Sequence, residues 1–194
     1  MPAQPLSHHL YTLAGNNAWA NHRLLKACSQ LSQAEFEATR TSFFPSLKAT
    51  LNHNLTVDWF YVDALEREAR GEPPHPRIGE FFTNEQPCNS CAQLHEAQRA
   101  VDARLLAYCD GLTDDGLQRP VTIQRATRTQ VETRTRLLAH LFEHQLHHRG
   151  QAHAMLAGTP VKPPQLDEFF CVLDAPLRAQ ELAELGLSEQ AFWG

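Results

Sequence analysis

The sequence has no long apolar run and no surplus of basic residues. No stretch reaches the roughly 18 consecutive apolar residues that mark a membrane-spanning helix. The formal net charge is -5, whereas a protein that binds a nucleic-acid duplex needs clustered Lys and Arg side chains to neutralise phosphates. These absences argue against an integral membrane protein and against a nucleic-acid partner.

A regular cysteine array and a recognisable secretory signal are also missing. Residues 1–15 contain no basic segment followed by a continuous apolar stretch. The cysteines are odd in number and scattered, which is typical of reduced thiols rather than of a disulfide framework. They are Cys28, Cys88, Cys91, Cys109 and Cys171. We therefore expect a cytoplasmic protein.

Length and composition are those of an ordinary globular protein. The chain has 194 residues, of which 42% are apolar and 20% charged, and these proportions argue against disorder. Chains of this length commonly form one domain. We expect a single domain over residues 1–194, with a C-terminal appendage over about 160–194.

Apolar residues recur at three- and four-residue steps in four long segments, which predicts four helices. We expect them over about residues 7–28, 46–69, 90–109 and 132–157, and Gly or Pro residues follow the last three. Ser7 is a candidate N-cap for the first helix, and the third begins at Asn89 or Ser90. Four long helices joined by loops predict an all-α four-helix bundle, a fold that builds sites from side chains on facing helices.

Two shorter features lie outside the predicted bundle helices. Residues 121–123 read Val-Thr-Ile, and this β-branched segment favours a short strand or a small hairpin between the third and fourth helices. Residues 166–193 predict one or two short helices that pack on the bundle.

Histidine is the residue type that stands out. Eleven histidines occur, and five lie on the predicted fourth helix: His140, His144, His147, His148 and His153. Residues four apart lie one helical turn above each other, so His144 and His148 can direct ring nitrogens at one ion. A third ligand must come from another helix. His53 is the best candidate because it lies between Leu51 and Leu55, where an imidazole is costly to bury without a partner.

The same residues allow other interpretations. A single histidine on an apolar face, such as His53, is commonly a hydrogen-bonded core residue. His140 shares the helical stripe of His144, and together with Glu143 they match the H-x-x-E-H pattern of one class of zinc peptidases. That class needs an acidic third ligand on a much larger scaffold, so we do not favour it. The H-E-x-x-H motif is absent, because Gln145 follows His144.

The remaining histidines carry no motif, and we expect them at the surface. They are His8, His9, His22, His75 and His95.

Cys88-Asn-Ser-Cys91 is a C-x-x-C pair at a predicted helix N-terminus, where the helix dipole favours a reactive thiolate. The pair stands alone, without a second C-x-x-C or a βαβ pattern, so two small residues near a helix start is the simpler interpretation.

Four residues are candidates for groups that contact the metal ligands without binding the metal themselves. They are His140, Glu143, Asp58 and Arg149. For Asp58 and Arg149, an inter-helix ion pair is an alternative, and plain surface charges are at least as good an interpretation.

Three segments of the sequence carry a family resemblance. Residues 140–151 read HLFEHQLHHRGQ, residues 51–53 read LNH, and residues 17–25 read NAWANHRLL. Together they resemble the DinB/YfiT family of damage-inducible bacterial proteins over nearly the whole chain. The resemblance implies an up-down four-helix bundle that pairs into a homodimer. It also implies a divalent metal, often zinc or nickel, bound at the positions of His53, His144 and His148. Glu143 departs from the Asn that the family often shows there.

A metal on three histidines would keep an open coordination position. That layout is typical of a catalytic site, in which the metal lowers the pKa of a bound water toward about 7 or holds a thiol as the thiolate. Relatives that this chain resembles include enzymes that transfer sulfur or isomerise small electrophiles with a low-molecular-weight thiol.

Two functions are consistent with these residues. We expect a metal-dependent transferase or hydrolase that acts on a small molecule, for example in thiol-dependent detoxification, with no catalytic residue identified beyond the ligands. The alternative is a non-enzymatic metal-binding stress protein whose ion staples the second helix to the fourth. A DNA-binding function, which the family name suggests, is disfavoured by the net negative charge.

Overall fold

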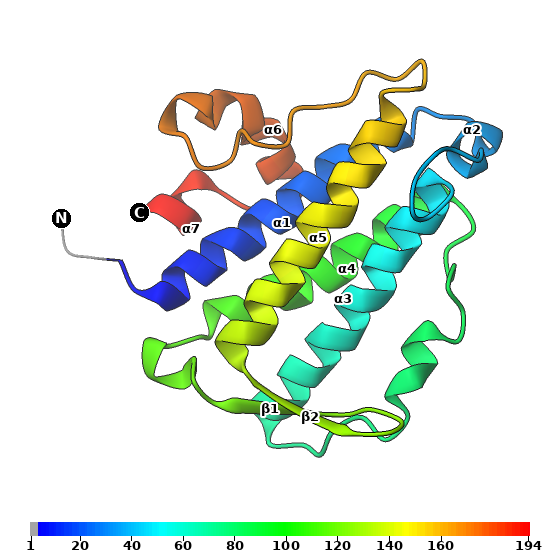
Figure 1. The fold of residues 1–194 in the computed structure, drawn as a ribbon. Helices are drawn as coiled ribbons and strands as arrows, with labels where there is room; N and C mark the ends of the chain where they lie inside the picture. Colours follow the sequence, from blue (N-terminus) through cyan, green and yellow to red (C-terminus); the bar gives the residue numbers. More distant parts are fainter. Residues whose placement is uncertain (1–3) are drawn as a thin grey trace.

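The structure is a computed structural model that describes residues 4–194, and it is predominantly helical. Within these residues it has seven α-helices and one two-stranded sheet. Four of the helices are long and form the body of the molecule (Figure 1). They are α1 (Leu6–Cys28), α3 (Leu47–Arg70), α4 (Cys91–Asp110) and α5 (Arg134–Leu156). The four predicted long helices are confirmed, each within two residues of the expected bounds.

Capping side chains and a glycine set the ends of α3 and α4. The Ser46 hydroxyl accepts a hydrogen bond from the first turn of α3, and Ser90 forms a reciprocal capping box with Gln93 at the start of α4. Helix α3 ends at Gly71, whose φ of 68° lies in the left-handed region that glycine adopts without strain. These local signals explain why the helix bounds were readable from the sequence.

The start of α1 differs from the prediction. Ser7 was expected to cap the helix, but it lies inside the first turn, and Pro5 occupies the capping position. The carboxylate of Asp114, in the short helix η2 (Asp114–Gly116), accepts hydrogen bonds from the backbone N–H groups of Leu6 and Ser7, at 3.2 and 2.8 Å. A distant acidic side chain therefore satisfies donors that a local cap would otherwise satisfy.

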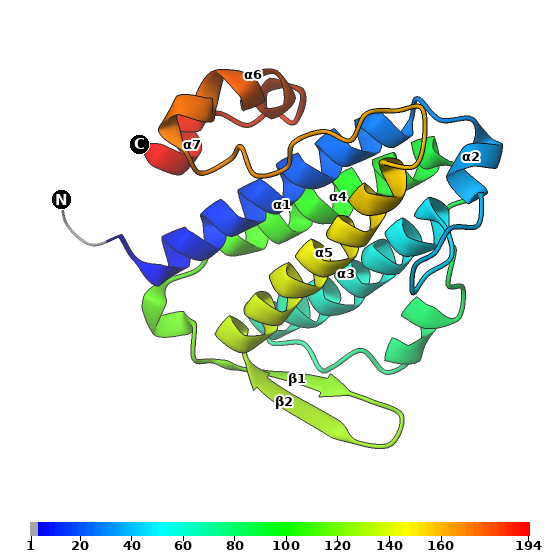
Figure 2. The same ribbon diagram turned by 45° about the horizontal axis from the view of Figure 1, so that its top comes forward.

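The long helices pack in pairs. Helix α1 lies mainly against α4 and α3 lies mainly against α5, and α3 also contacts α4 (Figure 2). All four contribute to one apolar core, in which Leu24, Leu55, Leu105 and Leu138 are almost completely buried. Removing this apolar surface from water is the main term that stabilises the arrangement. The packing turns one face of α3 toward α5, and the candidate site lies between them.

A small antiparallel hairpin joins α4 to α5, as predicted. Strand β1 (Pro120–Gln124) pairs with β2 (Thr129–Thr133). Val121 and Ile123 alternate with more exposed neighbours and are fully buried. The hairpin covers one end of the long helices (Figure 1).

The C-terminal segment packs on α1, also as expected. Its helices are η3 (Val172–Asp174), α6 (Ala175–Glu184) and α7 (Glu189–Trp193). Trp19 of α1 joins Phe169, Leu182 and Phe192 in a second buried apolar cluster. The contact requires Gly15, because a Cβ atom there would lie 2.3 Å from the ring of Phe192.

Two short helical segments flank α3 in the sequence, α2 (Gln33–Glu37) before it and η1 (Ile78–Phe82) after it. Within residues 4–194, no helix is both long enough and apolar enough to cross a lipid bilayer.

Candidate metal centre

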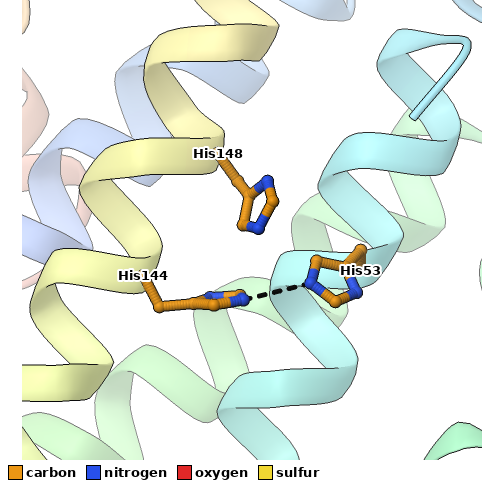
Figure 3. Close-up of side chains that lie close together, drawn as sticks. All are labelled: His53, His144 and His148. Atoms are coloured by element: carbon orange, nitrogen blue, oxygen red, sulfur yellow. Dashed lines mark hydrogen bonds between the residues drawn. The ribbon is translucent and has the colours of Figure 1, made fainter. Parts of the chain in front are cut away.

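Three histidine side chains meet between α3 and α5. His53 lies in the second turn of α3, and His144 and His148 lie one turn apart in α5, so all three rings point into the same space (Figure 3). The Nε2 atoms of His53 and His144 are 3.0 Å apart. One ligand nitrogen from each ring lies within 4.8 Å of the other two. The structure therefore brings together the three residues that the sequence predicted.

The environment of the cluster favours neutral imidazoles. Burial, and then the neighbouring His148, lower the pKa of His53 to about 4. Burial and the surrounding histidines lower the pKa of His144 to about 3, and burial lowers the pKa of His148 as well. At neutral pH the rings keep nitrogen lone pairs, which a metal ion needs from its ligands.

Gln151 fixes the orientation of one ring. Its Oε1 atom lies 2.8 Å from Nδ1 of His148, so this nitrogen donates to the amide and Nε2 is left for the cluster. The Nε2 atom of the same amide lies 3.1 Å from Nε2 of His147. This role of Gln151 was not predicted, although its position three residues after His148 places it on the same side of the helix.

Phe44 covers the cluster from outside the helices. Its ring stacks on His53 with centroids 4.3 Å apart, and it also contacts His148 at 5.4 Å. Phe44 lies in the loop over residues 38–46, before α3, where no helical periodicity points to a contact. No pattern in the sequence indicated that Phe44 contacts the histidine cluster.

The donor set fits a divalent transition metal. Three imidazoles at Zn–N distances of about 2.0–2.1 Å have nitrogens about 3.3 Å apart in tetrahedral geometry. The nitrogens found here, 3.0 Å apart for one pair and within 4.8 Å overall, approach that arrangement. One feature differs from well-supported metal ligands: Nδ1 of His144 is buried and has no hydrogen-bond partner among residues 4–194.

A cavity of about 270 Å³ opens beside the cluster. His53 forms part of its wall, and two phenylalanines give it an apolar lining, with Glu85 and Gln86 as polar groups. Its lining residues are Phe44, Ala49, His53, Thr56, Phe82, Glu85 and Gln86. The cluster is therefore next to space in which a small molecule can be accommodated.

Two of the proposed supporting groups on α5 are exposed. His140 packs edge-on against Tyr61, and its ring centroid lies 6.2 Å from that of His144. Glu143 lines a groove between α1 and α5 instead of the histidine cluster. In the described part of the chain, neither residue has a hydrogen bond to the three histidines. The H-x-x-E-H interpretation is not supported, because His144 is grouped with His53 and His148 and not with His140.

The other two proposed supporting groups lie deeper in the molecule. Asp58 and Arg149 are 1% and 4% exposed, so their interpretation as surface charges is wrong. Over residues 4–194 they have no hydrogen bond to the three histidines. They belong instead to a separate cluster of buried polar side chains that also includes Gln98 and Asp102.

The C-x-x-C pair does not form a reactive thiolate site. Burial raises the pKa of Cys91 to about 11 and also raises that of Cys88. Helix α4 begins at Cys91, close to the expected start at Asn89 or Ser90, but removing the thiols from water outweighs the helix dipole. The backbone of Cys88 instead exchanges two hydrogen bonds with the side chain of Asn52, which joins the segment before α4 to α3.

Comparison with known proteins gives one consistent result. A family model described as the DinB family matches residues 6–175. The chain is 20% identical over 152 residues to a protein named Protein DinB from Bacillus subtilis (strain 168), covering 78% of this chain and 86% of that protein. It is also similar to the crystal structure of a DinB-like protein from Bacillus cereus ATCC 10987. That match has a TM-score of 0.58 and 16% identity, over 78% of this chain and 91% of the other. Since the family model spans most of the sequence, the chain belongs to the DinB family.

Proposed function

We propose that His53, His144 and His148 bind one divalent transition-metal ion, zinc or nickel, in a site that acts on a small molecule. The observation that carries this proposal is the convergence of three neutral imidazole nitrogens within 4.8 Å. Three ligands leave a coordination position open. We infer a metal-dependent transferase or hydrolase, with a low-molecular-weight thiol as a second substrate or cofactor.

The residues around the histidines have distinct roles in this proposal. The ion, when bound, supplies a Lewis acid that holds water or a thiol in its deprotonated form. Gln151 keeps Nε2 of His148 directed at the site through its contact with Nδ1. Phe44 excludes water from one side of His53. The adjoining cavity takes a small substrate whose apolar part lies against Phe44 and Phe82.

We also propose the architecture and assembly that the family implies. The four long helices form an up-down bundle within a single domain over residues 1–194, and two copies pair into a homodimer in the cytoplasm. The packing of Leu182 and Phe192 on α1 supports including the C-terminal segment in the domain, although the family model ends at residue 175. Sedimentation of the purified protein tests the homodimer.

The alternative is a non-enzymatic stress protein in which the ion staples α3 to α5. The distribution of the ligands is consistent with such a role, since they lie on two helices that already pack together. The cavity beside His53 favours catalysis, because a purely structural ion does not need adjoining space.

Metal analysis tests the proposed ligands. We expect about one zinc or nickel ion per chain in the wild type, and little in His53→Ala and His144→Ala. His140→Ala is the matched control, because His140 is an exposed histidine on the same helix that lies outside the cluster. Equal metal content in the wild type and in both cluster variants would refute the proposal.

An activity screen then separates the two functions. Metal-loaded wild type is incubated with thiols and small electrophiles, and product formation is compared with metal-loaded Phe82→Ala, which enlarges the cavity without removing a ligand. Metal-dependent turnover that changes with Phe82 supports the enzyme. Metal binding without turnover, together with a large rise in thermal stability, supports a structural ion.

A further inference from the structure

A second polar cluster lies buried among the four long helices, away from the cavity. It contains six side chains that are each less than 5% exposed, and we call it the buried polar cluster. Its members are Asn17 and Asn21 of α1, Asp58 of α3, Gln98 and Asp102 of α4, and Arg149 of α5. Three of the six carry ionisable groups, and nothing in the proposed metal chemistry uses them.

Within this cluster, Arg149 and Asp102 are connected through the side-chain amides of Asn17 and Asn21. Arg149 donates to the side-chain oxygens of Asn17 and Asn21, at 2.6 and 2.9 Å. The amide nitrogens of the same two residues donate to the Asp102 carboxylate, at 3.1 to 3.2 Å. Gln98 adds another donor to Asp102 at 3.1 Å. The positive charge of Arg149 is therefore matched to Asp102, which accepts the hydrogen bonds that a carboxylate requires.

Asp58 has no such compensation. Its Oδ2 atom accepts one hydrogen bond from Gln98 at 2.7 Å, while Oδ1 is buried with no partner among residues 4–194. If Asp58 and Asp102 were both charged, the cluster would hold two anions and one cation out of contact with water. Such an excess buried charge is strongly unfavourable, and a carboxyl group avoids it by keeping its proton.

The side chain of Gln145 offers a partner for that proton. Its amide is among the groups that act on the pKa of the Asp58 carboxyl. Its Nε2 atom donates to the backbone oxygen of Asn54 at 3.3 Å, but its Oε1 atom is buried and unpartnered in the described part of the chain. Since a side-chain amide can present either end, turning Oε1 toward a hydroxyl on Asp58 would satisfy Oε1 and Oδ1 together, in exchange for the contact of Nε2 with Asn54.

We propose that Asp58 is a neutral carboxylic acid whose hydroxyl donates to Gln145, and that it is a positioning residue linking α3 to α5. Gln145 follows His144 in the sequence, and Asn54, the residue that its amide contacts here, follows His53. The link therefore involves the helical turns that carry two of the clustered histidines. The protonation of Asp58 does not depend on metal binding, so it can fail or hold separately from the proposed function.

Among the groups that face Asp58 from each packed element, Asp102 favours the neutral form, whereas Gln98, Gln145 and Arg149 favour the charged form, and burial together with Asp102 outweighs them. Helix α4 contributes the negative Asp102, α5 contributes the more distant positive Arg149 and the amide of Gln145, and α1 contributes only amides to the cluster. Burial, followed by the charge of Asp102, raises the pKa of Asp58. A raised carboxyl pKa means that the folded protein holds a proton the unfolded chain has lost. The free energy of unfolding therefore decreases as pH rises from about 4 through the raised value.

The substitutions Asp58→Asn and Asp102→Asn distinguish the neutral acid from the charged one. Asparagine has one donor end and one acceptor end, as a neutral acid has, so Asp58→Asn should fold like the wild type. We expect its melting temperature to exceed that of the wild type by at least about 5 °C at pH 8, with a smaller gap at pH 5. Asp102→Asn leaves Arg149 without a counter-charge and should lower the melting temperature at both pH values.

Infrared difference spectra detect the proton on the Asp58 carboxyl group directly. The carbonyl stretch of a protonated carboxylic acid should be present in the wild type at pH 7 and absent in Asp58→Asn. This comparison remains valid if Asp102→Asn fails to fold. A wild type that lacks the band, or an Asp58→Asn variant as destabilised as Asp102→Asn at pH 8, would overturn the proposal.

Discussion

Two clusters of histidines lie at different places in this molecule, and only one has the arrangement of a metal site. In the first, His53 and His144 have nitrogens 3.0 Å apart, with His148 beside them. In the second, Nδ1 of His22 lies 2.8 Å from Nε2 of His95. The close approach of two imidazoles is therefore common to both, and it does not by itself indicate a metal.

The difference lies in what the remaining nitrogens contact. Nε2 of His22 is 2.7 Å from Glu184, so both ring nitrogens of His22 are already engaged. Glu184 also accepts hydrogen bonds from Lys26, and these contacts lower its pKa to about 2. The first cluster contains no carboxylate, and its nitrogens point at one another. In the second cluster, the carboxylate of Glu184 and the two histidines form hydrogen bonds that connect α1, α4 and α6.

Removing a histidine from each cluster should give the largest contrast. His144→Ala takes one of three ligands, and we expect metal content to fall from about one ion per chain to less than about 0.1. His22→Ala should leave metal content unchanged. Plasma emission analysis after dialysis measures both, and an equal loss in the two variants would remove the distinction between the clusters.

Acidification should act on the first cluster through its lowered pKa values. As pH falls below the ordinary imidazole pKa of 6.5, His53 and His144 become protonated in the unfolded chain. In the folded protein they stay neutral until the pH reaches about 4 and 3, respectively. The free energy of unfolding of the metal-free protein should therefore decrease over this range. Denaturant titrations from pH 7 to 4 measure it. A double His53→Gln, His144→Gln variant should show a shallower decrease, and an unchanged slope would contradict the assignment.

Loss of the Gln151 amide should weaken the first cluster without removing a ligand. Gln151→Ala frees Nδ1 of His148 to turn, and we expect metal affinity to fall by about 10- to 100-fold. Competition with a chromophoric chelator gives the affinity. Gln180→Ala is the matched control: Gln180 donates a hydrogen bond to Glu184 of the second cluster, and its loss should leave metal affinity at the wild-type value.

The smallest effect is expected for the contacts of Glu184 with His22 and Lys26. Glu184→Gln keeps the shape of the side chain but removes its charge opposite His22 and Lys26, so we expect a loss of about 0.5–1 kcal/mol in unfolding free energy. Chemical denaturation measures this loss, which should shrink at high salt. A change in metal affinity instead would mean that the two clusters are coupled.

The comparison also shows what the sequence could and could not predict. The long helices followed from apolar periodicity and from stops such as Gly71, because both signals are local. The pair His144 and His148 followed from helical spacing. His53 was selected by its apolar setting and by the family resemblance. His22 was expected at the surface but is 5% exposed, and its acceptor Glu184 lies 162 residues further along the chain. No local pattern encodes such a partner.

The buried charges were misread for the same reason. Asp58 and Arg149 looked equally suited to the surface, because the groups that contact them come from two other helices, α1 and α4. The cysteine pair shows the opposite error. Its position at the start of α4 was predicted correctly, but the burial that raises the thiol pKa depends on tertiary packing. Side-chain chemistry that depends on long-range contacts was the part that sequence patterns left undetermined.

The contact between His53 and His144 spans 91 residues of chain. Closing so long a loop costs entropy, and the donors meet only after α3 and α5 have docked. A newly made chain therefore offers an ion at most the local pair of His144 and His148, and it offers the full set only at the end of folding. In the proposed function, tight binding is thus reserved for the completed protein, and an ion bound there would raise the free energy of unfolding by joining distant parts of the chain.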